Sequence, residues 1–229
     1  IKGALVGAII GGGLMVLFIW FYNSTGELFW LWTWGAIATF MILATMFYAS
    51  VIVPLFNKLT PLEDGELKSE ITTYCKKVGF NLDNLFVMDG SKRSSKANAF
   101  FSGLGSKKRI VLYDTLANEY SKEEITAVLA HEIGHYKKKH TLTSMVVGVL
   151  QMGVMLFILS LVINQSEFSM ALGVQEQSFH IGLLVFSMLY SPLSMLIGVV
   201  MNVLSRKNEY EADNYAKTTY KAEPLVSSL

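Results

Sequence analysis

Residues 131–135, which read His-Glu-Ile-Gly-His, are the part of this sequence best suited to metal chemistry. Histidines four positions apart lie about 40° apart around a helix, so both imidazoles can reach one ion. Glu132 lies on the adjacent flank, where it could take a proton from a water at the metal. The pattern therefore predicts a catalytic zinc site, with Glu132 as the catalytic base. For the five residues alone, two solvated histidines are the simpler alternative, so the rest of the sequence must decide.

A catalytic zinc takes a third protein ligand and keeps one position open. The other histidines do not fit this role. On an uninterrupted helix, His140 lies roughly opposite His131, and His180 follows a further apolar segment. We therefore interpret His140 and His180 as structural residues, although His140 could make a local hydrogen bond.

Carboxylates must then supply the third ligand, and three of them follow the last apolar segment: Glu209, Glu211 and Asp213. Glu209 and Asp213 share a helical face, whereas Glu211 points away from it. We expect Glu209 to bind the metal and Asp213 to orient a ligand histidine through a hydrogen bond. The alternative is an ordinary solvated face that pairs with Arg206 and Lys207.

The elements that must position these residues include membrane segments. Hydrophobic residues make up 52% of the 229 residues, charged residues make up 16%, and the mean hydropathy is +0.41. Soluble domains carry about 25% charged residues. Four uncharged stretches are long enough to cross a bilayer, at residues 3–22, 28–53, 141–163 and 179–205. His135 and Glu209 each lie within about 10 Å of a span end at 1.5 Å per residue, so we expect them at similar depths.

Basic residues fix the expected orientation. All 19 Lys and Arg residues fall at Lys2, between Lys58 and Lys139, or from Arg206 onward. If all four stretches cross the membrane, these regions lie on one side, which the positive-inside rule makes cytoplasmic. The host membrane would be a bacterial inner membrane or the endoplasmic reticulum, depending on the source. A net charge of +1 gives no basic field for nucleic acid.

The pattern predicts four parts: a transmembrane hairpin (1–56), a cytoplasmic α+β insert with the zinc helix (57–140), a second transmembrane hairpin (141–205) and a cytoplasmic helix (206–229). The fold class is a mainly α, polytopic membrane protein with a small zincin-like α+β catalytic domain. Within the insert we expect a helix over 66–78, strands at 85–88, 97–101 and 109–113, and a helix that starts at a capping box, Ser121 with Glu124. Cys75 is read as a reduced structural residue. The first and last residues suggest a fragment of a longer protein.

Longer motifs resemble the type I CAAX prenyl endopeptidases, integral-membrane zinc proteases that process isoprenylated C-termini. Besides residues 131–135, the similar segments are 89–100, 108–116 and 205–213, and the resemblance runs from about Leu55 to Ala216. The family has more membrane spans than these four, arranged around an intramembrane chamber. It also places a further polar residue near the substrate from a C-terminal segment beyond this chain.

The resemblance implies a metalloendopeptidase with one Zn²⁺ per chain, bound by His131, His135 and Glu209. Asn98 and Ala99 would hold the substrate backbone, as when an extended peptide adds to a strand edge. The expected partners are the lipid bilayer and a peptide or protein substrate, for which the resemblance implies prenylation. One alternative is an HtpX-like quality-control protease. Another is a non-catalytic transporter or scaffold with a metal site, which the absence of acidic or basic residues in the spans disfavours.

Overall fold

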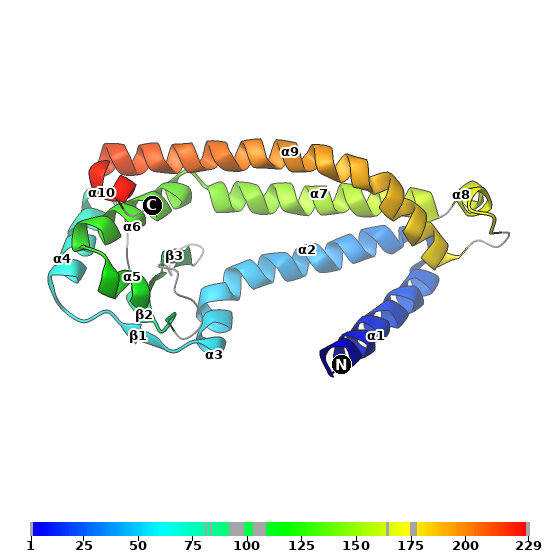
Figure 1. Cartoon of the computed structure of the whole chain (residues 1–229), viewed down its shortest axis with the longest axis horizontal. Coiled ribbons are helices and arrows are strands. Elements are labelled where there is room, and N and C mark those ends of the chain that lie inside the picture. The colour runs from blue at the N-terminus through cyan, green and yellow to red at the C-terminus, as the bar shows by residue number, and fades with distance from the viewer. Residues whose placement is uncertain are drawn as a thin grey trace. The chain divides into compact units, whose positions relative to one another are not determined.

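The computed structural model describes residues 2–80, 82, 84–91, 99–102, 109–163, 165–174 and 178–227. The chain divides into two compact units. Figure 1 shows the order of the elements along the chain. Unit 1 comprises Ile1–Phe40 and Val146–Val200, and unit 2 comprises Met41–Met145 and Met201–Leu229.

The described residues of unit 1 form helices joined by short connections, with no strand among them. It contains α1 (Lys2–Thr25), the first part of α2 (Phe29–Phe47), most of α7 (His140–Ile163), α8 (Ser166–Ala171) and the first half of α9 (Phe179–Thr219). Its core is made of large apolar side chains, such as Phe29, Ile163 and Phe186. Helices α2 and α7 approach closely where Trp34 lies against Gly153. The Trp34 Nε1–H donates a hydrogen bond to the Val149 carbonyl at 2.8 Å, which satisfies the indole in an apolar setting.

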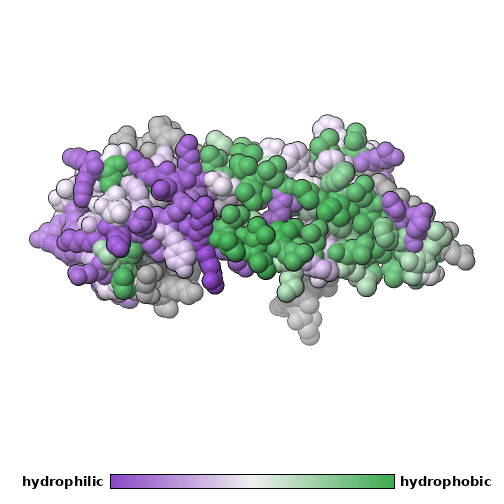
Figure 2. All heavy atoms as spheres, turned by 90° about the horizontal axis from the view of Figure 1, so that it is seen from above, coloured by the Kyte–Doolittle hydropathy of each residue, from purple (hydrophilic) through white to green (hydrophobic). Residues whose placement is uncertain are grey.

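Three described stretches are long and apolar enough to cross a membrane: Ile10–Phe47, His140–Ile163 and Phe179–Thr219. Our first two expected segments, 3–22 and 28–53, both overlap the first stretch, in which a 3₁₀ turn at Gly26–Leu28 separates the two helices. The side chains on these helices are largely exposed and apolar, and Figure 2 shows hydrophobic residues gathered over the first half of α9. Such surfaces are stable against lipid and not against water, which confirms the predicted class of membrane protein.

Unit 2 contains a four-stranded sheet, in the order β1-β2-β4-β3. Its strands are β1 (Leu59–Pro61), β2 (Asn84–Met88), β3 (Ala99–Ser102) and β4 (Arg109–Tyr113). Strands β2 and β4 are parallel, and the other two pairings are antiparallel. The short strand β1 was not predicted, because proline disfavours strands except at an edge, where this strand lies. Strand β3 forms the opposite edge among the described strands.

Helices pack on this sheet: α4 (Glu66–Lys77), α5 (Asp114–Glu119) and α6 (Lys122–Lys137). Their shared core includes Ile71, Leu112, Leu129 and Ile133, all 0–1% exposed. The predicted capping box at the start of α6 is confirmed. The Ser121 hydroxyl accepts the Glu124 N–H at 3.3 Å, and the Glu124 carboxylate accepts the Ser121 N–H at 2.9 Å. This cap fixes where the helix begins and hence which residues face the sheet.

Helix α6 does not continue into the next membrane segment. It ends at Lys137 with Lys138 as its C-cap, Lys139 adopts a left-handed conformation with φ 60°, and α7 starts at His140. Left-handed backbone outside glycine ends a helix and turns the chain. Our assumption of one uninterrupted helix through His140 is therefore wrong.

Helix α9, in contrast, runs without a break for 41 residues, from the apolar segment through Glu209 and Asp213. Its last residues are tied to α4 in unit 2. Thr219 shares a hydrogen bond with the Tyr74 hydroxyl at 2.7 Å and accepts one from the Lys77 amine at its carbonyl at 2.8 Å. Tyr220 adds a hydrogen bond to Glu70. These bonds join the C-terminal end of α9 and the residue after it to α4, within unit 2.

Candidate metal centre

Helix α6 presents two histidines on one flank while its opposite flank is buried. Ile133 and Ala130 pack into the core of unit 2, so His131 and His135 face outward from it. Their side chains are 17% and 20% exposed, and their Nε2 atoms lie 3.0 Å apart. The i, i+4 spacing thus brings two imidazole nitrogens to one point, as predicted.

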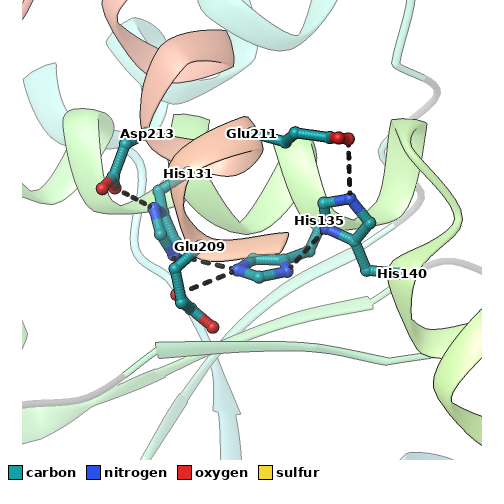
Figure 3. Close-up of polar contacts among 6 residues, drawn as sticks. All are labelled: His131, His135, His140, Glu209, Glu211 and Asp213. Atoms are coloured by element: carbon teal, nitrogen blue, oxygen red, sulfur yellow. Dashed lines mark hydrogen bonds and ion pairs between the residues drawn. The ribbon is translucent and has the colours of Figure 1, made fainter. Parts of the chain in front are cut away.

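Glu209 reaches this point from α9. Its Oε2 lies 3.3 Å from His131 Nε2 and 3.5 Å from His135 Nε2, and Figure 3 shows the three side chains converging. Possible ligand atoms of these three residues all lie within 4.8 Å of one another. The close approach depends on Gly134, because a Cβ there would lie 3.1 Å from Ala212 Cα on α9.

The spacing of these three atoms fits a single metal ion. Zinc binds histidine nitrogen and carboxylate oxygen at about 2.0–2.2 Å, and a tetrahedral arrangement then separates the ligand atoms by about 3.3–3.5 Å. The observed separations are 3.0, 3.3 and 3.5 Å. Two imidazoles and one carboxylate, with a fourth position open, are also the donor set of a catalytic zinc.

Asp213 lies one helical turn beyond Glu209 and contacts the other side of the His131 ring. Its Oδ1 is 2.8 Å from His131 Nδ1. The carboxylate can only accept here, so His131 carries its proton on Nδ1 and presents the Nε2 lone pair toward the cluster. The sequence predicted this pairing from the helical spacing of the two carboxylates.

His140 and Glu211 form a second set of contacts that sequence reasoning missed. The Nδ1 atoms of His140 and His135 lie 3.0 Å apart, and His140 Nε2 lies 3.3 Å from Glu211 Oε2 (Figure 3). Our placement of His140 away from the site is wrong, because the chain turns at Lys139. Glu211 does point away from the predicted metal, but toward His140. Residues 136–139 contain no Gly or Pro, so the sequence carried no conventional signal of the turn.

The surroundings of the cluster shift the pKa of Glu132 and the pKa of His135 in opposite directions. Burial raises the pKa of the Glu132 carboxyl above its ordinary value, Glu209 adds to this rise, and His131 opposes it. A carboxyl with a raised pKa binds protons more readily, which suits a group that accepts and returns one. Burial, assisted by the neighbouring His131, lowers the pKa of His135. A neutral imidazole is the form that binds a metal.

The other predicted site residues are placed as follows. Ala99 is buried and begins the edge strand β3, which contacts α6. Asn98 lies outside the described residues. His180 belongs to unit 1, is exposed and lies 3.3 Å from the Ser178 hydroxyl. Cys75 is a buried free thiol, as expected.

Comparisons with known proteins cover the chain almost completely. The family model for peptidase family M48 matches residues 61–228, and the model described as "CAAX prenyl protease N-terminal, five membrane helices" matches residues 1–58. The chain is similar to CAAX prenyl protease 1 of Saccharomyces cerevisiae, with 39% identity over 100% of this chain and 54% of that protein. It is 42% identical to the CAAX prenyl protease 1 homolog of Dictyostelium discoideum, over 91% of this chain and 50% of that protein.

The crystal structure of S. mikatae Ste24p is similar, with a TM-score of 0.78 and 38% identity, over 95% of this chain and 54% of that one. The chain thus spans about half the length of the relatives it matches. The match to the membrane-helix model, together with the long apolar helices, shows an integral membrane protein. The metallopeptidase family implies a metal cofactor. This chain belongs to peptidase family M48 and is a relative of the CAAX prenyl proteases.

Proposed function

We propose that this chain carries the catalytic centre of a zinc metalloendopeptidase that processes CAAX-type C-termini of prenylated proteins. The observation that supports the proposal most strongly is the convergence of His131, His135 and Glu209 within 4.8 Å, in a chain of a peptidase family. The names of its relatives suggest the substrate class.

In the proposed mechanism, His131, His135 and Glu209 hold one zinc ion. The ion would supply a Lewis acid that polarises the scissile carbonyl and acidifies a water molecule. Glu132 would accept a proton from the attacking water and return it to the amine nitrogen as the peptide C–N bond breaks. Its raised pKa favours the temporary protonated state. Asp213 would keep the His131 ring in the orientation and tautomer that ligation needs.

Substrate binding would use the edge of the sheet. Strand β3 begins at Ala99, pairs with β4 on one side and lies at the edge of the described sheet. An extended peptide can add to such an edge through main-chain hydrogen bonds, which demand little of its sequence. We assign Ala99, with the preceding Asn98, to this role. Contact between α6 and β3 supports it, because a peptide on this edge would run beside the zinc-binding helix.

We further propose that the centre faces the cytoplasm. All the basic residues apart from Lys2 fall within residues 58–139 or 206–229, and both ranges belong to unit 2 together with the cluster. The positive-inside rule assigns such regions to the cytoplasmic side. Labelling single cysteines introduced at exposed positions such as Glu63, from outside sealed vesicles of known orientation, would test this assignment.

Glu132→Gln tests the mechanism. The amide has nearly the same shape but cannot hold the proton, so we expect full zinc content and a loss of cleavage of at least about 100-fold. The substrate claim needs a second comparison, between prenylated and unprenylated forms of one peptide. Equal cleavage rates would refute prenyl-specific processing and favour HtpX-like general proteolysis, whereas a Glu132→Gln variant with undiminished activity would refute the catalytic role.

A further inference from the structure

His140 is a buried histidine with two polar partners and no part in the mechanism described so far. It is 6% exposed and lies between His135 on α6 and Glu211 on α9. All three residues belong to unit 2. We propose that His140, backed by Glu211, is a positioning residue that holds the ring of His135 for metal binding; this inference rests on the proposed zinc site.

The donors and acceptors in the series His135, His140 and Glu211 follow from which ring nitrogen of His135 must face the metal. Its Nε2 faces His131 and Glu209, so it must offer a lone pair there, and its proton is then on Nδ1. That Nδ1–H donates to His140 Nδ1 at 3.0 Å, which must therefore carry a lone pair. The proton of neutral His140 is left on Nε2, which donates to Glu211 Oε2 at 3.3 Å. This assignment of neutral tautomers gives a donor and an acceptor to each of the two hydrogen bonds that link His135, His140 and Glu211.

Both proposed ligand histidines then donate their Nδ1–H to an acceptor on the side of the ring away from the metal. Asp213 accepts the Nδ1–H of His131 directly. For His135 the carboxylate of Glu211 acts through one intervening imidazole. A ligand histidine almost always donates its second N–H to an acceptor, because this fixes the ring and strengthens the lone pair on the metal side. Without His140, the His135 ring would lack that acceptor among the groups whose contacts are described here.

Burial makes the role of His140 difficult for water to replace. A side chain 6% exposed leaves little access for solvent, so an apolar replacement would leave the His135 Nδ1–H without a partner. The left-handed turn at Lys139 is what brings His140 back over His135. His140 is also the first residue of α7, so the junction between the catalytic helix and a membrane helix contributes to the metal centre.

The test uses the intact purified protein, with Zn²⁺ affinity measured by competition with a chelating dye. The visible absorption of the Co²⁺-substituted protein reports ligand geometry. His140→Leu removes the acceptor, whereas His140→Asn keeps one, because its side-chain oxygen can occupy the position of Nδ1. Glu211→Leu removes the end of the chain. Lys207→Met is the matched control, because Lys207 pairs with Glu211 at 3.9 Å without contacting a histidine of the cluster.

We expect His140→Leu to bind Zn²⁺ about 10- to 100-fold more weakly and to alter the Co²⁺ spectrum, as is typical when such a partner of a ligand is lost. His140→Asn should recover most of the affinity, Glu211→Leu should lose less than His140→Leu, and Lys207→Met should match the unmodified protein. Unchanged affinity and spectrum in His140→Leu would overturn the inference, as would an equal loss in His140→Asn. If His140→Leu does not fold, the comparison between Glu211→Leu and Lys207→Met decides. Equal Zn²⁺ affinities of these two variants would then overturn the inference. An unmodified protein that binds no zinc would refute the proposed function itself, so the two failures are distinguishable.

Discussion

Gly134 lies on α6 against Ala212 and Tyr215 of α9, and Gly134→Ala is a small change that should disturb the proposed metal centre without touching a ligand. The added Cβ would lie 3.1 Å from Ala212 Cα, 3.2 Å from the Ala212 carbonyl oxygen and 3.2 Å from Tyr215 Cβ. Ordinary contacts between carbon atoms are about 3.5–4.0 Å. The two neighbours on α9 are backbone and a Cβ, so α9 must move as a whole.

The displacement can be worked out from these distances. Restoring a contact of about 3.5 Å from 3.1 Å requires α9 to retreat by about 0.4 Å. Glu209 lies on the same turns of α9 and would move with it. Metal–ligand distances tolerate about 0.2 Å, so the shift exceeds the tolerance about twofold. Overpacking costs about 1–3 kcal/mol, and replacing a helical glycine by alanine returns about 1 kcal/mol, which leaves a net loss of about 0–2 kcal/mol.

We therefore expect Gly134→Ala to fold but to bind zinc roughly 5- to 10-fold more weakly, with cleavage reduced at least as much. Chelator competition and thermal melting on the same samples would measure both effects. Gly65→Ala is the matched control, because Gly65 has extended backbone and its Cβ would meet nothing within 4 Å. If Gly134→Ala binds zinc and cleaves substrate as well as the unmodified protein does, the close-approach argument is refuted.

Two further predictions concern the scaffold around the centre. Ser121→Ala removes the N-cap of α6, the helix that carries His131 and His135, and should lower the free energy of unfolding by about 1 kcal/mol in denaturant titrations, with the proposed zinc stoichiometry retained. No loss of stability would contradict the capping role. Burial raises the pKa of the Cys75 thiol from 9.0 to about 11, so the unfolded chain ionises first. Ionisation of the thiol in the unfolded chain favours unfolding, so the stability contributed by the neutral, buried Cys75 thiol is complete below about pH 9 and is lost as the pH rises through about 11. The melting temperature should therefore fall more steeply between about pH 9 and 11 in the unmodified protein than in Cys75→Val. Parallel curves for the two proteins would contradict it.

Local signals in the sequence were sufficient for much of the fold. Uncharged stretches predicted the helical membrane class, a short run rich in β-forming residues predicted strand β4, and Ser121 with Glu124 predicted the start of α6. These features depend on residues close together in the chain. Strand β1 could not be foreseen, because three residues ending in a proline become a strand only by pairing with β2 far along the chain.

The candidate site divides in the same way. Spacing along single helices brought His131 to His135 and aligned Glu209 with Asp213, so that part of the geometry was predictable. His140 was misplaced because helical extrapolation fails across one left-handed residue that no Gly or Pro announces. A contact set by such a turn depends on the packing of the whole unit and not on the local sequence.

Metal content of the intact protein tests the central claim most directly, measured for the unmodified protein, Glu209→Ala and the control Glu119→Ala, with cleavage assayed on the same samples. The proposed centre requires about one zinc per chain in the unmodified protein and the control. It also requires loss of both zinc and activity in Glu209→Ala, because two histidines alone hold a catalytic zinc poorly. Full zinc content and full activity in Glu209→Ala would contradict the assignment of the third ligand and, with it, the proposed architecture of the active site.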